Sequence, residues 1–362
     1  MHILFIIPSL GRGGAEINTL KLTDHFLSLD YEVTILLTSD NCEIINQFNP
    51  RTNFLILGNQ TLVQSLKEIG SAVSKVNPNV IFANLWPLTF LTSISLIFSP
   101  RYLRKLVIIE HIDLRVALNS CSYFERILEN IFHFIAPFFV KYIVGVSPGV
   151  LKSVKKSSFI LPNKFKFIAN PIYKSSEYRV PTKVKNFIEI PSPLRILAVG
   201  NLKPQKDYPT MLRVIRYLRD QNYNPQLTIA GDGQLRPFIE QLILTYSLGS
   251  NVKLLGSVKD VFKLFDINDI YLMTSSWEGF GNSLAEALVA GCRCVSTNCR
   301  SGPSYILGNG KFGTLANTRD FKSISEAIIT ELMIKRVPND FNESITRFSV
   351  ERIGKLYEEL IL

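Results

Sequence analysis

Two carboxylates around a glycine-rich turn are the residues of this sequence whose types and spacing most clearly suggest chemistry. In WEGFGNSLAEALVAGC (277–292), Glu278 precedes a Gly-Phe-Gly-Asn turn and Glu286 stands inside an apolar helical run. The pattern predicts a strand, a loop and a helix capped by Asn282 or Ser283. A carboxylate near a helix N-terminus suits the helix dipole, which explains Glu286 but leaves Glu278 unexplained. Two acids beside a helix N-terminus suit a ligand with several hydroxyls and an anion, as in a nucleotide-sugar.

Two lysines follow the first strand predicted in the second half of the chain. In VGNLKPQKDYP (199–209), Lys203 and Lys206 stand just beyond the end of that strand. There they can meet phosphate as point charges. A pair of solvated surface lysines is the alternative interpretation.

A glycine cluster follows the first predicted strand of the chain. In FIIPSLGRGGAEINTL, Gly11, Gly13 and Gly14 separate a strand from a helix, so the backbone can approach a ligand at a helix N-terminus. A dinucleotide fingerprint needs a small residue three positions after Gly13, where Glu16 stands. A dehydrogenase therefore loses its main support, and plain turn glycines are the alternative.

A histidine ends another strand of the first half. EHID places His111 at the carboxyl end of the predicted strand 106–111. A lone histidine is usually a satisfied core or surface residue, but at a strand end that faces a cleft it becomes a candidate for ligand contact.

Short apolar runs alternate with helical patterns in both halves of the chain. This rhythm predicts buried parallel sheets covered by helices. It stops after residue 171 and restarts at 195, with a Pro- and Lys-containing stretch between them that is typical of a linker. We therefore predict an α/β protein of two facing Rossmann-like, doubly wound domains, residues 1–185 and 190–340, with the active site in the cleft between them.

Composition excludes several classes of protein. The chain has 362 residues and a net charge of +10, and residues 1–185 hold 20 Lys and Arg against 12 Asp and Glu. This excess favours an anionic surface or substrate, but the basic residues are too dispersed for a nucleic-acid-binding module. The five cysteines lack zinc-site spacing, and no apolar run has the roughly 20 residues of a membrane span. We expect a cytoplasmic protein.

The motifs together resemble one known family. E-x7-E in EGFGNSLAEALVAG, followed by VSTNCRSGPSYIL, resembles the donor signature of retaining glycosyltransferase family 4, among the group 1 glycosyltransferases. PSLGRGGAE is similar to the family's first glycine-rich loop, VGNLKPQK to its G-R-L-x-x-x-K motif, and FSVERIGKLYEELI to its closing helix. The resemblance implies the GT-B fold, in which the last helix, here within 341–362, packs back on the first domain.

The resemblance also assigns roles to donor-binding residues. Glu278 would hold hydroxyls of the transferred sugar, Glu286 the ribose and Lys206 the β-phosphate. Backbone amides of the turn and the helix start would line the sugar and diphosphate: Gly279, Phe280, Gly281, Asn282, Ser283 and Leu284. Asn201 stands where the family usually has an arginine, so Lys203 would supply the missing phosphate charge.

Residues of the first domain complete the implied site. His111 would reach the donor sugar across the cleft and, with Glu278, form the catalytic pair. Gly14 would let the front loop approach the donor phosphate, and Gly13 the acceptor.

The implied activity is a hexosyl transfer with retention of anomeric configuration. The donor of the hexose or N-acetylhexosamine would be a nucleotide-sugar, UDP-linked on family frequency. The acceptor would be a hydroxyl of a lipid-linked (polyprenyl-diphosphate) or cell-surface glycan, as in polysaccharide, lipopolysaccharide or capsule synthesis. No D-x-D pair is present, so we expect no metal and no other cofactor.

Three alternatives stay open at this stage. The apolar segment 124–141, preceded by basic SPRYLRK (99–105), either rests on the inner face of an anionic membrane or is a core helix. A non-hydrolysing nucleotide-sugar epimerase would share the architecture and would turn over its donor without an acceptor. A non-catalytic GT-B partner subunit would also share it, although such a protein would be expected to lose some of Lys206, Glu278 and Glu286.

Overall fold

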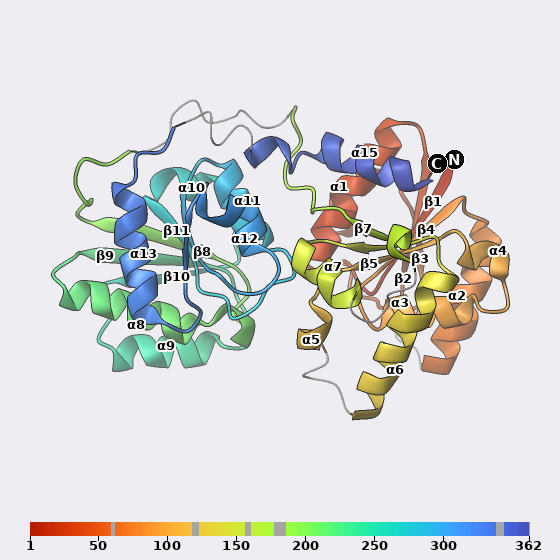
Figure 1. The fold of residues 1–362 in the computed structure, drawn as a ribbon, viewed down its shortest axis with the longest axis horizontal. Helices are drawn as coiled ribbons and strands as arrows, with labels where there is room; N and C mark the ends of the chain where they lie inside the picture. Colours follow the sequence, from red (N-terminus) through yellow and green to blue (C-terminus); the bar gives the residue numbers. More distant parts are fainter. Residues whose placement is uncertain (59–61, 118–122, 156–160, 177–185, 338–343, 362) are drawn as a thin grey trace. The chain divides into compact units, whose positions relative to one another are not determined.

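The chain forms two compact units. The computed structural model (Figure 1) describes residues 1–362 apart from 59–61, 118–122, 156–160, 177–185, 338–343 and 362. The first unit comprises Met1–Pro171 with Ser349–Leu362, and the second comprises Ile172–Phe348. The chain thus passes from the first unit to the second after residue 171 rather than near residue 185. The described residues of the predicted linker therefore belong to the second unit.

The first unit is built on a parallel sheet of seven strands in the order β3-β2-β1-β4-β5-β6-β7. The strands are β1 (His2–Ile7), β2 (Glu32–Leu37), β3 (Asn53–Ile56), β4 (Val80–Asn84), β5 (Leu106–Glu110), β6 (Tyr142–Gly145) and β7 (Phe165–Phe167). Its helices are α1 (Gly14–Ser28), α2 (Leu62–Val76), α3 (Leu88–Ser95), α4 (Pro100–Leu103), α5 (Leu114–Ala117), α6 (Tyr123–Ile135), α7 (Pro148–Lys155) and α15 (Val350–Ile361), with the short turns η1 (Ile45–Gln47), η3 (Ala136–Phe138) and η4 (Pro162–Lys164). The central strands are buried along their whole length, as their continuous apolar sequences require.

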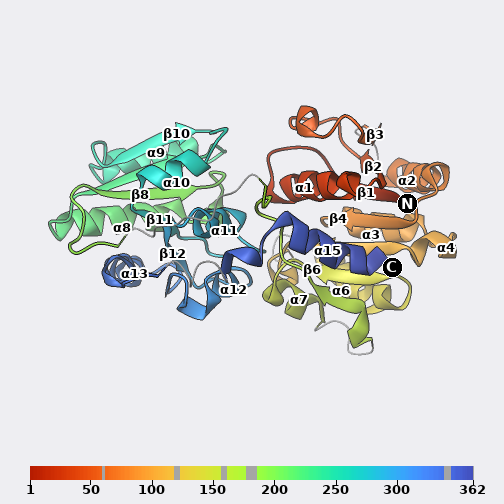
Figure 2. The same ribbon diagram turned by 90° about the horizontal axis from the view of Figure 1, so that it is seen from above.

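The closing helix α15 packs on α1 within the first unit, and Figures 1 and 2 show the two helices side by side. Tyr357 meets Phe82 edge-on, with ring centroids 5.5 Å apart. Nε2 of His25 lies 2.8 Å from a carboxylate oxygen of Glu358. A Cβ atom at Gly354 would overlap the His25 imidazole ring, so only glycine allows this close approach.

The second unit is built on a parallel sheet of six strands in the order β10-β9-β8-β11-β12-β13. The strands are β8 (Leu194–Val199), β9 (Pro225–Ala230), β10 (Val252–Gly256), β11 (Ile270–Met273), β12 (Arg293–Thr297) and β13 (Thr314–Ala316). Its helices are α8 (Tyr208–Asp220), α9 (Arg236–Thr245), α10 (Phe262–Ile267), α11 (Asn282–Val289), α12 (Pro303–Ile306) and α13 (Phe321–Met333), with the short turns η5 (Pro204–Lys206) and η6 (Gly308–Gly310). None of the helices described in either unit combines the length and apolar character needed to cross a membrane.

A buried charge network ties the segment before β8 into the second unit. The side-chain oxygen of Asn186 accepts hydrogen bonds from the Arg293 guanidinium at 2.7 Å and from the Arg336 backbone N–H at 2.9 Å. Glu331 is fully buried and pairs with both arginines. Buried charges are tolerated only when they are paired and hydrogen-bonded. Because Asn186 bonds to both arginines of this network, the end of the predicted linker belongs to the second unit.

Each sheet has the doubly wound order, so the predicted α/β class is confirmed for both units. The chain leaves the central strand toward one edge and then returns to extend the other edge. The direction changes between β1 and β4 in the first unit, and between β8 and β11 in the second. Ligands of such sheets bind beyond the carboxyl ends of the strands at this switch point.

Replacing Gly354 by alanine is expected to lower the free energy of unfolding by about 1–3 kcal/mol, because the added methyl group must push α15 away from His25. Gly249→Ala is the matched control, since a Cβ there meets no atom within 4 Å. Urea denaturation of both variants tests the close approach. Equal stabilities would show that α15 moves without cost.

Candidate functional site

The loops that follow β8 and β11 lie side by side at the switch point of the second unit. The two strands pair in parallel, with Ile270 opposite Ile196 and Tyr271 opposite Leu197. Each therefore delivers its following loop to the same edge of the sheet. Lys206 lies in the loop after β8, and Glu278 lies in the loop after β11.

Glu278 and Lys206 form a buried ion pair. The Lys206 ammonium lies 2.7 Å from Oε1 of Glu278, and the side chains are only 18% and 7% exposed. The Ser275 hydroxyl also donates to Oε1, at 2.7 Å, and the Gln205 amide donates to Oε2 at 3.1 Å. Three donors therefore hold the carboxylate in one orientation.

Further hydrogen bonds join the two loops along their backbones. The Gln205 amide also donates to the Trp277 carbonyl at 2.9 Å, and the Ser276 N–H donates to the Gln205 carbonyl at 2.8 Å. The Thr274 hydroxyl donates to the Lys206 carbonyl at 2.9 Å. The loops thus form one rigid block around the ion pair. Sequence patterns did not single out Gln205 and Ser275, since a polar residue near a strand end has no distinctive spacing.

Helix α11 begins directly after this block, and its cap differs from the prediction. The prediction that Asn282 or Ser283 caps the helix was wrong, because Gly281 is the cap and Asn282 is the first helical residue. Gly281 has φ of 104°, in the left-handed region that favours glycine. The Ser283 hydroxyl instead accepts a hydrogen bond from Tyr271 at 2.8 Å. The positive end of the α11 dipole therefore lies beside Glu278, where an anion would be stabilised.

The remaining residues predicted for the second unit take three kinds of position. Glu286 is half-buried in α11, while Asn201 and Lys203 are exposed in the loop after β8. Phe280 is buried against Phe348, with ring centroids 5.7 Å apart. The backbone of Gly279 to Leu284 forms the turn and the first turn of α11, as predicted. Their roles toward a ligand stay predictions.

The predicted residues of the first unit follow β1 and β5. Gly13 caps α1 and Gly14 is its first residue, so the glycine loop does open a helix. Nε2 of His111 lies 2.9 Å from the side-chain oxygen of Asn84, the last residue of β4. Since β4 borders the switch point, this bond holds His111 near that point. Only the fold reveals Asn84 as the partner, because 27 residues separate the two.

Burial lowers the pKa of His111 to about 4, although the neighbouring Glu110 opposes the shift. The imidazole is therefore neutral at physiological pH. It can donate or accept a hydrogen bond there, but it does not supply a positive charge.

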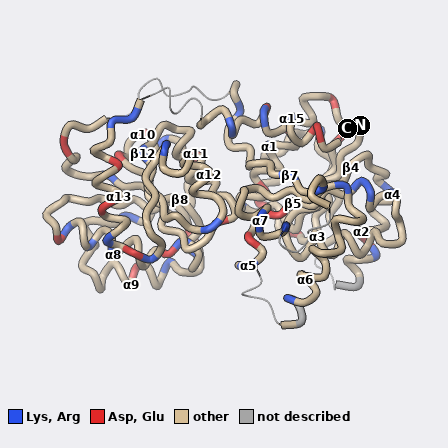
Figure 3. The backbone as a smooth tube through the Cα atoms, viewed as in Figure 1, with Lys and Arg blue, Asp and Glu red and all other residues tan. Residues whose placement is uncertain are grey.

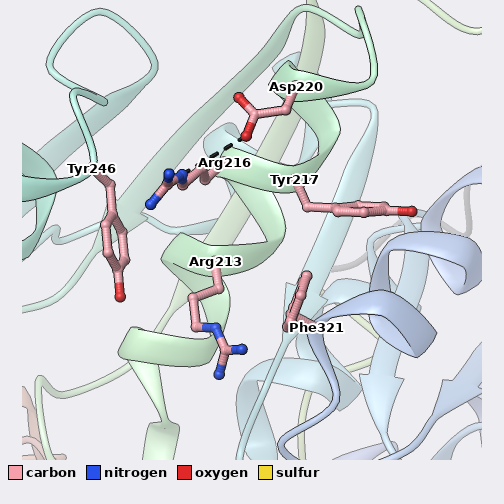
Figure 4. Close-up of a pocket in the computed structure, with 6 residues that line it drawn as sticks. All are labelled: Arg213, Arg216, Tyr217, Asp220, Tyr246 and Phe321. Carbon is pink, nitrogen blue, oxygen red and sulfur yellow. Dashed lines mark ion pairs between the residues drawn. The ribbon is translucent and has the colours of Figure 1, made fainter.

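A pocket of about 280 Å³ lies on the second unit beside α8 (Figure 4). Arg213 lies over the Phe321 ring at 4.4 Å, and Arg216 lies over the Tyr246 ring at 5.5 Å and near Asp220 at 3.7 Å. These contacts join α8 to α13 and to the end of α9. Neither Lys206 nor Glu278 is among the residues that line this pocket. Within the described ranges, no three His, Cys, Asp or Glu side chains gather closely enough to hold a metal ion.

Comparison with known proteins agrees with this geometry. Residues 182–347 match the family described as "Glycosyl transferases group 1". An uncharacterized glycosyltransferase of Methanocaldococcus jannaschii is 27% identical over 280 residues, covering 66% of this chain and 68% of that protein. The N-acetylgalactosamine-N,N'-diacetylbacillosaminyl-diphospho-undecaprenol 4-alpha-N-acetylgalactosaminyltransferase of Campylobacter jejuni is 25% identical, covering 90% of this chain and 88% of its own.

One solved structure extends the likeness to the whole chain. Anabaena HepE, solved with UDP and glucose, superposes with a TM-score of 0.78 at 18% identity, covering 99% of this chain and 98% of its own. At this identity the likeness concerns the fold, and it confirms the GT-B fold implied by the sequence motifs.

A double-mutant cycle measures the central ion pair. Lys206→Met and Glu278→Gln are each expected to lower the free energy of unfolding by about 3 kcal/mol, because each leaves a buried polar group without its partner. The double variant is expected to lose less than the sum, with a coupling energy above about 1 kcal/mol. Urea denaturation followed by tryptophan fluorescence gives the four stabilities. The exposed pair Arg236–Glu240 is the control, with an expected coupling below about 1 kcal/mol. Equal couplings would contradict a buried, structured pair.

The lowered pKa of His111 predicts an acid-sensitive contribution to stability. Its folded pKa of about 4 lies below the ordinary value of 6.5, so the unfolded chain binds the proton more readily between these values. The free energy of unfolding should therefore fall as pH drops from 6.5 to 4, by roughly 2–3 kcal/mol from this group. His111→Asn should lose this component. Denaturation curves of both proteins at pH 7, 5.5 and 4.5 test it, and parallel pH profiles would contradict the assignment.

Proposed function

We propose that this chain, whose residues 182–347 match the group 1 glycosyltransferase family, transfers a hexose or N-acetylhexosamine from a UDP-sugar to a hydroxyl of a lipid-linked glycan. The proposed transfer retains the anomeric configuration and needs no metal ion. The observation that carries the proposal is the Lys206–Glu278 pair at the switch point, beside the N-terminus of α11.

Glu278 keeps limited room for a ligand. A carboxylate has about four acceptor sites, and Lys206, Ser275 and Gln205 use three of them. One direction, on Oε2, is left for a sugar hydroxyl. A carboxylate held by three donors suits binding rather than nucleophilic attack. This favours retention through front-face attack of the acceptor hydroxyl over a covalent glycosyl-enzyme.

Lys206 and helix α11 together would meet the diphosphate. An ammonium group has three N–H donors, and one of those of Lys206 donates to Glu278. Because Glu278 offsets part of its charge, Lys206 alone is a weak partner for a departing nucleoside diphosphate. The N–H groups at the start of α11 supply a second source of positive potential at the same edge. This pairing is the physical basis for proposing transfer without a metal.

His111 and the glycine loop would contribute from the first unit. The imidazole is neutral and held by Asn84, so it would offer a directed hydrogen bond to the donor sugar. Gly13 and Gly14 open α1 after β1, which suits close approach of acceptor and phosphate.

The acceptor is proposed from the relatives. The Campylobacter jejuni protein is named for a diphospho-undecaprenol-linked sugar acceptor and covers nearly the whole chain. An Escherichia coli relative, 26% identical over 178 residues, is named for a similar acceptor and for UDP-galactose. We therefore propose a polyprenyl-diphosphate-linked glycan acceptor and action at the cytoplasmic face of the membrane.

Thermal stabilisation by UDP, GDP, ADP and CDP, each with EDTA, tests the donor site. UDP is expected to raise the melting temperature by several degrees, because a ligand at a hundred times its Kd adds about 2.7 kcal/mol. Lys206→Ala should abolish the shift, whereas Lys322→Ala, which removes an exposed lysine of α13, should keep it. No shift with any nucleotide would overturn the donor-site proposal and favour a non-catalytic partner.

Turnover of UDP-sugars then tests the reaction. With an undecaprenyl-diphosphate-linked sugar as acceptor, we expect glycosyl transfer, and we expect Glu278→Ala to lose this activity. The anomeric configuration of the new linkage should match that of the sugar in the donor. Formation of a new nucleotide-sugar without acceptor would instead identify an epimerase. An inverted product would overturn retention.

A further inference from the structure

Helix α6 of the first unit has two apolar sides. Its inner side packs into the core, where Phe132 meets Phe90 edge-on with ring centroids 5.3 Å apart. Phe132 and the next residue, His133, are both buried. The segment predicted either to rest on a membrane or to be a core helix is therefore a core helix along this inner side.

The opposite side of α6 and the following turn η3 is apolar but exposed. We call these residues the outer stripe: Ile127, Ile131, Phe134, Ile135, Phe138 and Phe139, which are 39%, 49%, 47%, 43%, 47% and 53% exposed. The spacing i, i+4, i+7, i+8 places the members within α6 on one side of the helix, opposite the buried Glu129 and His133. Exposed apolar residues gathered in this way mark an interaction surface, whereas scattered ones do not.

Buried polar contacts prevent the helix from turning its outer stripe inward. Nδ1 of His133 lies 2.9 Å from the Glu129 carbonyl, and its Nε2 lies 3.4 Å from Oε1 of Glu110 at the end of β5. Both acids are buried. Rotating α6 would move His133 away from Glu110 and leave that buried carboxylate without this partner, which is costly. The exposure of the stripe is therefore fixed by the packing of its inner side.

The segment of the first unit that contains α6 carries an excess of basic residues. Residues 99–171 contain 11 Lys and Arg against 4 Asp and Glu. Three of the four acids, Glu110, Asp113 and Glu129, are buried, so they add little to the surface charge. Arg101 and Lys152 of this segment are exposed. Figure 3 shows where lysines and arginines lie along the backbone of the first unit. An exposed apolar stripe within a basic segment matches an anionic bilayer better than a neutral protein surface.

We propose that the outer stripe of α6 and η3 docks into the interfacial layer of an anionic bilayer, with exposed lysines and arginines of residues 99–171 against the lipid phosphates. At 13 residues, α6 is about 20 Å long, which is too short to cross the hydrocarbon core. The helix therefore lies in the plane of the interface. This docking rests on the proposed function, because it would bring the protein to a lipid-linked acceptor. Vesicle binding is nevertheless measured without sugar transfer.

Co-sedimentation of the full chain with vesicles tests the docking surface. Vesicles of phosphatidylcholine with about 30% phosphatidylglycerol should bind the protein, because the anionic lipid gives them a negative surface potential. Vesicles of pure phosphatidylcholine should bind at least about tenfold less of it. Binding should weaken as the salt concentration rises from about 50 to about 500 mM, because salt screens the attraction between the basic residues and the lipid phosphates. Phe134→Ser and Ile131→Asp should each reduce binding about tenfold by removing apolar area from the interface.

A matched control separates docking from general surface hydrophobicity. Phe238 on α9 is also 47% exposed, so Phe238→Ser removes the same side chain at the same exposure from the second unit. This variant should bind vesicles like the unaltered protein. Unchanged melting temperatures of all three variants show that the fold persists.

Three outcomes would overturn the proposal. The first is absence of binding to anionic vesicles, and the second is equal binding by the Phe134→Ser and Phe238→Ser variants. The third is a dimer of the unaltered protein, seen by light scattering, that Phe134→Ser converts to a monomer, since a second copy would then cover the stripe. UDP stabilisation of the same variants is expected to be unchanged, so a failure of docking remains distinct from a failure of the donor site.

Discussion

The need to pair a buried charge organises the candidate site. Glu278 lies beyond β11 with almost no access to water, so its carboxylate requires donors from the protein. Lys206 supplies the charge from the loop after β8, and Ser275 and Gln205 supply further hydrogen bonds. The pair therefore fixes the distance between two loops that are far apart in sequence.

The doubly wound sheets explain why the pair lies where it does. In each unit the chain reverses direction next to its first strand, and the loops on either side of that reversal separate at the carboxyl edge. Lys206 and Glu278 occupy this position in the second unit, and the glycine loop with Asn84 and His111 occupies it in the first. One topology thus provides two comparable ligand edges. The side chains make them chemically different, with a buried ion pair in one and a neutral imidazole in the other.

The two units also bury different polar groups. In the second unit, Arg293 and Glu331 are enclosed in a network that fixes β12 against α13. In the first unit, Glu110 and Glu129 are both buried, and Glu110 contacts His133, which holds α6 by its inner side. Burying these acids leaves the basic residues of 99–171 dominant at the surface. The surface charge of the first unit is therefore partly a consequence of its core.

The sequence alone determined the fold class and the loops and helix that carry the candidate residues, because apolar periodicity and glycine turns are local signals. Alternating strands and helices predicted both sheets, and the spacing of Glu278 and Glu286 located the loop and helix that hold them. The tertiary structure decided which residues meet: the partners of Glu278 come from a loop more than 70 positions away. It also decided that Gly281 caps α11 and that Asn186 joins the second unit. Such contacts depend on strand order and burial, which bring distant segments together without leaving a local pattern.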